Sequence, residues 1–503
     1  MNRRIRLLIG SLRLAALLLA LSILPARAAS VAAPAATPSE PEAPTLAIVA
    51  EDRVALRAAP RASAQQHALL WAGDTLEVRG ERLDDLKVYD HRRERAGYVR
   101  ANQVRRLPAT AAGAPELLAV VRFLRELPGA EALGVGYVAA YLRAAPAEAI
   151  DAEVFDALGS MVDRLLRRAS VNRVRAQDEA LAAQVEVIRA YGIVILSYEH
   201  EGRVQLCSDG DADRRVMALP ATAAQRARAA LALTRPQCID PTMSPLARHA
   251  HDDWRAEVLA RVPLTELPAH EQARVRLRQA SVWAAIAHHR SRRGESPVEA
   301  AETALTALAA VDRAQLAEGD AETYQEAAIR VGASRWATEP APASRKGLDL
   351  ALKPGSEPGQ VCLTLIDGKQ ALFERCSYAT LWPASFRVNP AGTLATVAAQ
   401  PLDGWRELWV FRKTEAGWQL DVLPPGDEQP DLGYVEFAGW LPEPTKLLVA
   451  REVRRDGRYQ RTFELLDLEL LRVEKRAEEP EHLSPFYRWQ DPAWKRMTVS
   501  LRR

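Results

Sequence analysis

The 503-residue chain is 48% hydrophobic and 26% charged, a composition that excludes a fibrous or wholly disordered protein. It is too long for one hydrophobic core, because single cores stop growing at about 250–300 residues. The formal net charge of +2 at pH 7 is near zero, and basic residues at the N-terminus account for it.

The first 28 residues have the three parts of a secretory signal peptide. Four arginines precede a mostly apolar run, Leu14–Leu24, and Ala26-Arg27-Ala28 is typical of a cleavage site. An uncleaved anchor is the alternative, although a membrane-spanning helix needs about 20 apolar residues. Removing residues 1–28 takes away five arginines and no acids, so the net charge changes from +2 to about −3. We therefore expect no nucleic-acid partner, and contact with a membrane only through the signal peptide.

Residues 29–45 are rich in proline and alanine and lack any periodicity, which indicates a linker. Residues 46–107 are rich in strand-forming residues and turns. Gly73-Asp74 predicts a turn before Thr75–Val78, in which polar and apolar residues alternate as in a half-buried strand.

Residues 46–107 resemble a bacterial SH3-like (SH3b) domain. The elements that carry the resemblance are Leu56-Arg57 with Pro60, Leu69-Leu70, Gly73-Asp74, Leu76–Val78 and Gly97-Tyr98-Val99. The resemblance implies a small β-barrel that binds a cell-wall peptide or a protein. The family usually has a tryptophan in its central hairpin, and Leu83–Tyr89 has none. A ligand-binding groove would then consist of Trp71, Tyr89 and Tyr98; the alternative is that Trp71 and Tyr98 are half-buried barrel residues.

Residues 108–340 show the 3.6-residue apolar period of helices, as in Val154–Leu165. A β-rich stretch interrupts this pattern near residues 193–219, and a turn at Gly202 predicts a hairpin there. We expect a multi-helix domain with one inserted β-hairpin.

Residues 341–503 form a β-rich region with a weak internal repeat. Three stretches that begin at Phe386, Phe437 and Tyr487 each show an aromatic residue, a proline turn and an apolar strand. Their spacing resembles that of periplasmic β-propeller blades, but the region is shorter than the usual minimum of four blades. A partial propeller and a small antiparallel sheet or sandwich both remain open. The fold class that we predict is multi-domain α+β.

The four cysteines are Cys207, Cys238, Cys362 and Cys376. In an oxidising compartment an even number predicts disulfides. Three connectivities are possible, and pairing in sequence order would place each bridge within one domain. A metal site is the alternative, but no two cysteines are closer than fourteen positions.

Three short motifs lack the context that their chemistry requires. The G-x-G-x-x-A run Gly134–Ala139 lies among expected helices rather than after a strand. The acidic run Asp209–Asp213 lacks the later glycine and glutamate of a calcium loop. The run His249–Asp252 would spread over different helix faces, and we interpret it as a helix start with acidic capping residues. We predict no catalytic residue, no metal and no cofactor.

These features favour an exported, non-enzymatic binding or scaffold protein of the cell envelope, located in the periplasm. Its partner would be a cell-wall peptide or a periplasmic protein bound through the SH3-like module. The alternative is a cell-wall hydrolase or peptidase that uses this module for targeting.

Overall fold

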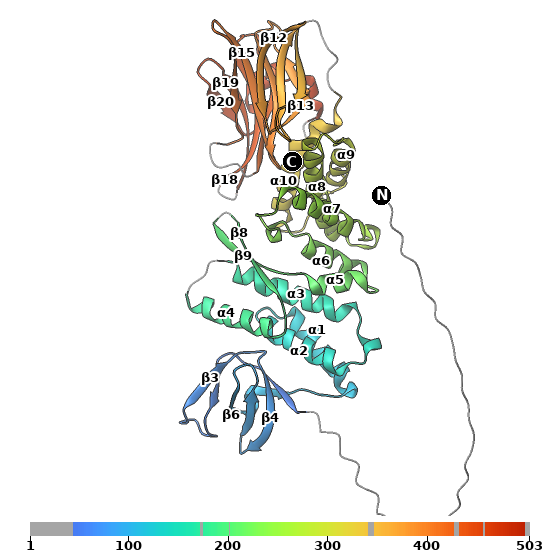
Figure 1. Ribbon diagram of the computed structural model, residues 1–503, viewed down its shortest axis with the longest axis vertical. Coiled ribbons are helices and arrows are strands. Elements are labelled where there is room, and N and C mark those ends of the chain that lie inside the picture. Colours follow the sequence, from blue (N-terminus) through green and yellow to red (C-terminus); the bar gives the residue numbers. More distant parts are fainter. Residues whose placement is uncertain are drawn as a thin grey trace, which may run out of the picture. The chain divides into compact units, whose positions relative to one another are not determined.

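The computed structural model describes residues 44–171, 175–200, 202–340, 347–426, 432–455 and 458–497. In chain order these residues form an antiparallel sheet, a run of helices with one hairpin, and further sheets (Figure 1). The predicted mixture of a multi-helix region with antiparallel sheets is confirmed. The predicted signal peptide, and all but the end of the linker, lie outside the described residues.

The N-terminal sheet has seven strands in the order β3-β2-β6-β5-β4-β1-β7. They are β1 (Leu46–Val49), β2 (Val54–Arg57), β3 (Gln66–Leu70), β4 (Thr75–Arg82), β5 (Asp85–Asp90), β6 (Arg95–Arg100) and β7 (Val104–Arg106). The outermost strands, β3 and β7, do not pair with each other, so the sheet is not closed into the barrel that we predicted. The reason is the geometry at its ends: closure needs edge strands that hydrogen-bond along their length, and β7 has only three residues.

Successive side chains along each strand of this sheet point to opposite faces. Leu86 and Val88 of β5 are buried in its core, while Lys87 and Tyr89 lie on the opposite face. The turn after β3 contains Gly73, with φ +97°. A Cβ at this position would lie 2.5 Å from the carbonyl oxygen of Ala132, so glycine lets the sheet approach the helices closely.

Ten helices lie between this sheet and the C-terminal strands in the described part of the chain. They are α1 (Ala114–Glu126), α2 (Glu131–Ala144), α3 (Ala152–Ala169), α4 (Arg175–Ala190), α5 (Asp211–Ala218), α6 (Ala223–Leu233), α7 (Pro245–Ala260), α8 (Ala269–Arg292), α9 (Val298–Ala309) and α10 (Asp320–Ser334). Between α4 and α5 lies the predicted hairpin, with strands β8 (Ile195–His200) and β9 (Arg203–Ser208). Short 3-10 turns include η4 (Pro236–Cys238) and η7 (Arg335–Thr338).

The G-x-G-x-x-A run lies inside α2 and does not open it. A Cβ on Gly134 would overlap Met161 Sδ of α3, and one on Gly136 would lie 2.5 Å from Ile48 Cδ1 of β1. Both glycines therefore leave room for neighbouring side chains to pack.

The start of α3 is capped by a side chain. The Asp151 carboxylate accepts a hydrogen bond from Glu153 N at 2.9 Å.

The C-terminal region has two sheets. Three strands form the smaller one: β10 (Leu348–Pro354), β11 (Val361–Asp367) and β12 (Gln370–Ser377). The larger has β13 (Thr380–Val388), β14 (Leu394–Leu402), β15 (Trp405–Thr414), β16 (Gly417–Leu423), β17 (Gly433–Trp440), β18 (Lys446–Arg455), β19 (Arg458–Asp467) and β20 (Arg472–Ala477). Its pairings are antiparallel except where the starts of β15 and β17 pair in parallel, at Trp405 and Gly433. This sheet is also open.

Two of the three stretches have the expected order of an aromatic residue, a turn and a strand. Phe386 lies in β13 and Phe437 in β17, each followed by a turn and an antiparallel strand. The prediction is wrong for the third stretch, because Tyr487 lies in the short helix α11 (Ser484–Trp489), with α12 (Pro492–Met497) after it. Phe486 is fully buried, and its ring lies 5.3 Å from that of Phe463, so this segment covers the sheet rather than extending it.

A buried ion-pair network, formed by Arg335, Arg406 and Glu436, joins the helices to the large sheet. Arg335 Nη2 and Arg406 Nη2 donate to the Glu436 carboxylate at 2.8 and 2.7 Å. Arg406 also donates to the carbonyl oxygens of Gly332 and Ala333 at the end of α10. All three network side chains are less than 5% exposed.

Candidate functional site

Trp71 lies in the hydrophobic cluster between the N-terminal sheet and the helices. It is 7% exposed and packs with Ala132, Val162 and Ile188, among others. Its backbone N–H donates to Asp74 Oδ2 at 3.0 Å. The ring therefore contributes to the contact between sheet and helices, and little of it is open to a ligand.

Tyr89 and Tyr98 share the outer face of the sheet. Tyr98 of β6 is paired with Lys87 of β5. Lys87 lies two residues before Tyr89 on the same strand, so all three side chains are on one face. The Arg79 guanidinium lies 4.0 Å from the centre of the Tyr89 ring, and the His91 ring meets it edge-on at 4.9 Å. The structure thus brings two of the three predicted aromatic residues to one face and places Trp71 elsewhere.

A groove of about 530 Å³ lies where the N-terminal sheet meets α2 and α4. We call it the junction groove. Its walls are Leu46, Gly73–Glu77 and Asp90–Arg92 from the sheet side and Arg143, Val187, Ala190 and Tyr191 from the helical side. This volume is in the range of small-molecule sites, roughly 300–1,000 Å³. Tyr89 reaches its rim through the contact with His91.

The carboxylates of the junction groove have cationic partners in the sheet itself. Asp74 pairs with Arg92 at 3.2 Å and with Arg93 at 3.0 Å, and Asp90 pairs with Arg93 at 2.8 Å. Glu77 accepts hydrogen bonds from Arg79, and together with the contact to His91 these lower its pKa.

Arg143, on the helical side of the junction groove, differs from the cations of the sheet side in its partners. It is exposed at the end of α2, and within the described residues it forms no ion pair or hydrogen bond. In the part of the chain that the structure describes, the groove therefore offers one cation without an ionic partner, an arrangement that suits a ligand with a carboxylate.

Tyr191 fixes the two sides of the junction groove to each other. Its hydroxyl donates to the Gly73 carbonyl oxygen at 2.6 Å and lies in hydrogen-bond contact with Thr75 Oγ1. Burial raises the pKa of this hydroxyl, so it is protonated at neutral pH and acts in the groove as a neutral polar group.

Both cysteine pairs are disulfides, joined in sequence order. Cys207 of β9 is bonded to Cys238 of η4, and Cys362 of β11 to Cys376, its direct cross-strand neighbour in β12. Glu374 lies close enough to the second pair to complete a metal-like cluster, but sulfurs bonded to each other offer no thiolate to a metal.

The run His249–Asp252 lies in the second turn of α7, after a start capped by the Ser244 side chain, so the prediction of an acid-capped start is wrong. His249 and Asp252 both contact His289, whereas His251 has a different neighbour. The His249 ring lies 4.2 Å from that of His289, and burial with nearby positive charge lowers the pKa of His249 to about 4. His251 packs beside Trp254, while Asp252 is buried and paired with arginines.

Sequence reasoning did not identify Arg143 or Tyr191. Both follow the ordinary pattern of a helix end, where a basic or amphipathic residue is common. Only the contact between sheet and helices makes them part of one groove.

Comparison of the chain with protein-family models, with curated proteins and with solved structures finds no match. No helix within the described ranges is long and apolar enough to cross a membrane.

Proposed function

We propose that the protein is exported to the periplasm and acts there as a non-enzymatic binding or scaffold protein, with a cell-wall peptide as its ligand. The SH3-like character of residues 46–107 suggests the ligand class. The observation that carries the proposal is the junction groove, in which a free Arg143 lies beside apolar wall residues and the Tyr191 hydroxyl.

Export is supported by the two disulfides, because such bonds persist in oxidising compartments. It is supported as well by the basic, apolar and small-residue pattern of residues 1–28. Neither observation depends on the identity of the ligand.

Peptides of the cell wall carry free carboxylates and short apolar side chains. In the junction groove a carboxylate would pair with Arg143, while apolar groups would contact Leu46 and Ala190, which are not buried. The groove's own acids are already paired, so they would not repel such a ligand.

The test is co-sedimentation of the mature protein with purified cell-wall sacculi. We expect the wild-type protein to sediment saturably, and Arg143→Gln to bind about tenfold more weakly, because a charge-assisted hydrogen bond is lost. Arg189→Gln is the matched control: Arg189 is exposed on α4, pairs with Glu186 at 3.0 Å and does not line the groove.

Equal sedimentation of wild type, Arg143→Gln and Arg189→Gln would remove the groove from the binding role. The same incubation separates binding from the enzymatic alternative. Soluble peptide or sugar fragments released from the sacculi over time would identify a hydrolase, whereas a binding protein releases none.

A further inference from the structure

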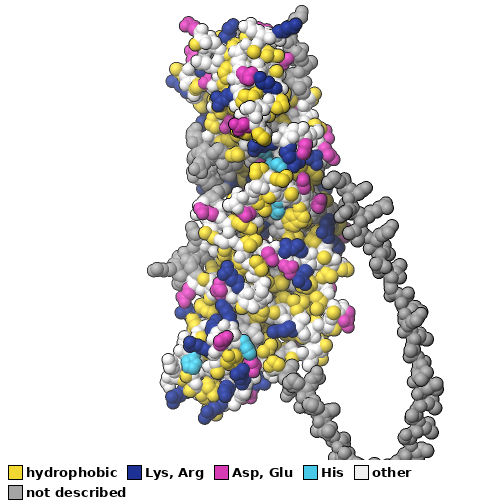
Figure 2. All heavy atoms as spheres, in the orientation of Figure 1, with side chains coloured by type: hydrophobic (Ala, Val, Ile, Leu, Met, Phe, Trp, Pro, Cys, Tyr) yellow, Lys and Arg dark blue, Asp and Glu magenta, His cyan; other side chains and the backbone are white. Residues whose placement is uncertain are grey.

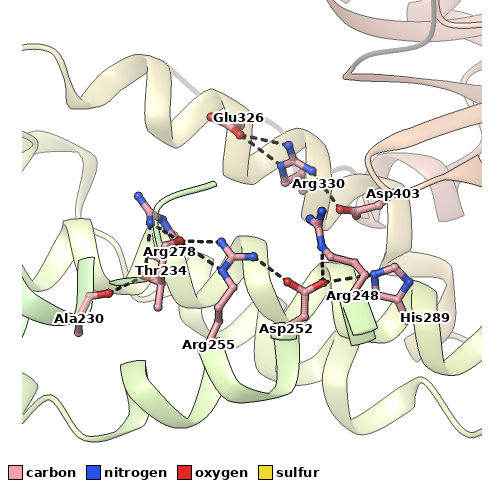
Figure 3. Close-up of polar contacts among 10 residues, drawn as sticks. All are labelled: Ala230, Thr234, Arg248, Asp252, Arg255, Arg278, His289, Glu326, Arg330 and Asp403. Atoms are coloured by element: carbon pink, nitrogen blue, oxygen red, sulfur yellow. Dashed lines mark hydrogen bonds and ion pairs between the residues drawn. The ribbon is translucent and has the colours of Figure 1, made fainter. Parts of the chain in front are cut away.

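A second, smaller cavity lies far along the chain from the junction groove. It has a volume of about 100 Å³ and is lined by residues of α7, α8, α10, η4 and the turn between β14 and β15. Four arginines face it: Arg248, Arg255, Arg278 and Arg330 (Figure 3). We call it the arginine cavity.

Two of these arginines share one buried carboxylate. Asp252 Oδ2 accepts from Arg248 Nε at 3.1 Å, and Asp252 Oδ1 accepts from Arg255 Nη1 at 2.8 Å. Asp252 is fully buried and also lies 3.3 Å from His289 Nε2. A single negative charge thus serves two guanidinium groups.

The other two carboxylates near the cavity, Glu326 and Asp403, lie on the side opposite Asp252 (Figure 3). Arg330 of α10 donates to Glu326 Oε1 at 3.2 Å, one turn earlier on the same helix. It donates also to Asp403 Oδ2 at 3.1 Å, in the turn after β14. Both carboxylates are therefore engaged by Arg330.

Arg278 has no carboxylate partner among the described residues. Its Nη1 donates to the carbonyl oxygen of Thr234 at 2.5 Å and lies 3.3 Å from both Thr234 Oγ1 and the Leu231 carbonyl oxygen. These acceptors belong to the C-terminal end of α6. No hydrogen bond from Arg278 Nε or Nη2 is found within the described ranges, so two donors of a positive group are left beside the cavity.

The charges around the cavity do not balance. Among the described residues, four guanidinium groups face three carboxylates, Asp252, Glu326 and Asp403. Burial and, to a smaller extent, the positive charge of Arg255 lower the pKa of Arg278 to about 9, and the carboxylate of Glu326 opposes this shift. An added anion would relieve this repulsion.

We propose that the arginine cavity binds a small oxyanion of the phosphate type beside Arg278, in the positive field of the other arginines that line the cavity. Planar guanidinium groups match the oxygens of such an anion in pairs. A volume near 100 Å³ holds only a few water-sized groups, far less than a drug-sized ligand needs. Arg248 and Arg330 are partly exposed, so the cavity is open to solvent.

The test is calorimetric titration of the full mature protein with inorganic phosphate, at constant ionic strength in chloride buffer. We expect one saturable site per chain. Arg278→Gln should weaken binding by about tenfold or more, because charged hydrogen bonds are lost. Glu326→Gln should strengthen binding, because it removes a carboxylate that competes for the cations. Two changes with opposite effects on affinity distinguish anion binding from a purely structural role.

Arg274→Gln is the matched control, since Arg274 lies on the same helix, is exposed and pairs with Asp320 at 2.8 Å. If Arg278→Gln fails to fold, Arg248→Gln replaces it, because Arg248 makes only one hydrogen bond to a carboxylate. Absence of saturable binding to the wild type would overturn the proposal, as would equal affinities of the wild type, the cavity variant and Arg274→Gln.

A second probe, glycerol phosphate, identifies the source of the anion. Weaker binding than that of inorganic phosphate supports a free ion as ligand, and equal binding supports a phosphate group on a larger molecule. The arginine cavity is independent of the junction groove, so Arg143→Gln should leave phosphate binding unchanged even if sacculus binding is lost.

Discussion

Asp213 of α5 is a buried acid in a negative environment. It is 8% exposed, and burial, together with the charges of Asp163 and Asp156, raises its pKa to about 8. The side chain is therefore mostly protonated in the folded protein at neutral pH, whereas it is ionised in the unfolded chain. Because the pKa is raised on folding, the stability that Asp213 contributes is complete below about pH 4 and is lost as the pH rises through about 8.

We predict that Asp213→Asn removes this loss of folding stability with rising pH. The variant should match the wild type near pH 4 and exceed its free energy of unfolding by about 2–4 kcal/mol at pH 8, since one pKa unit corresponds to about 1.4 kcal/mol. Urea unfolding at both pH values measures this. Asp211→Asn, on the exposed side of the same helix, is the control. If Asp213→Asn keeps the pH dependence of the wild type, Asp213 is not the group responsible.

Gly73 is the residue on which the contact between sheet and helices depends. An alanine there would combine a positive φ with an overlap against the Ala132 carbonyl oxygen. We predict that Gly73→Ala lowers the free energy of unfolding by about 2–4 kcal/mol. Gly129 has a similar φ of +93° and no atom near its Cβ position, so Gly129→Ala should cost only about 1 kcal/mol. Equal losses in thermal or urea unfolding would show that the close approach to α2 is unimportant.

At the scale of elements, the disulfide Cys207–Cys238 links the β8–β9 hairpin to η4, whose Pro236 and Gln237 line the arginine cavity. Replacing both cysteines by serine should cost about 2–4 kcal/mol of stability. It should also weaken phosphate binding, because the wall formed by η4 is no longer held in place. The control is the pair Cys362–Cys376, which joins β11 to β12 away from the cavity. Its double serine variant should bind phosphate as the wild type does, and a loss of binding there would contradict this role for η4.

The elements that the sequence predicted well are those with a local signal. The hairpin follows from alternating residues around the turn at Gly202, and the helices follow from the 3.6-residue period. The stretch at Tyr487 was misjudged because its aromatic residues suit either a strand or a helix. Trp494 of this stretch and the preceding Phe486 pack against Phe463, and these long-range contacts of the helical segment have no local signature.

At the scale of the whole molecule, basic side chains gather over the N-terminal sheet with acidic ones between them, on the face shown in Figure 2.

Neither the junction groove nor the arginine cavity could be predicted from the sequence. Arg278 and Asp403 belong to different parts of the chain, and an arginine in a helix is ordinarily a solvated residue. The significance of Arg278 comes only from its neighbours in the folded protein.

Glu436 connects the helices with the large sheet, since it accepts from Arg335 and Arg406 and from Trp494 Nε1 at 2.8 Å. We predict that Glu436→Gln lowers stability by about 3–5 kcal/mol, because it removes the buried carboxylate charge that accepts from both guanidinium groups. Calorimetry should then show the helices and the sheet unfolding in separate transitions. Glu443→Gln, which changes an exposed acid paired with Lys446, should have little effect. One transition and unchanged stability in Glu436→Gln would contradict the role of this network.

Intact-mass analysis of the protein recovered from the periplasm of a bacterial host tests the proposed export most directly. We predict a chain that begins at residue 29, with both disulfides closed and no cysteine alkylated before reduction. A full-length chain found only in the cytosol, with four alkylated cysteines, would contradict this account.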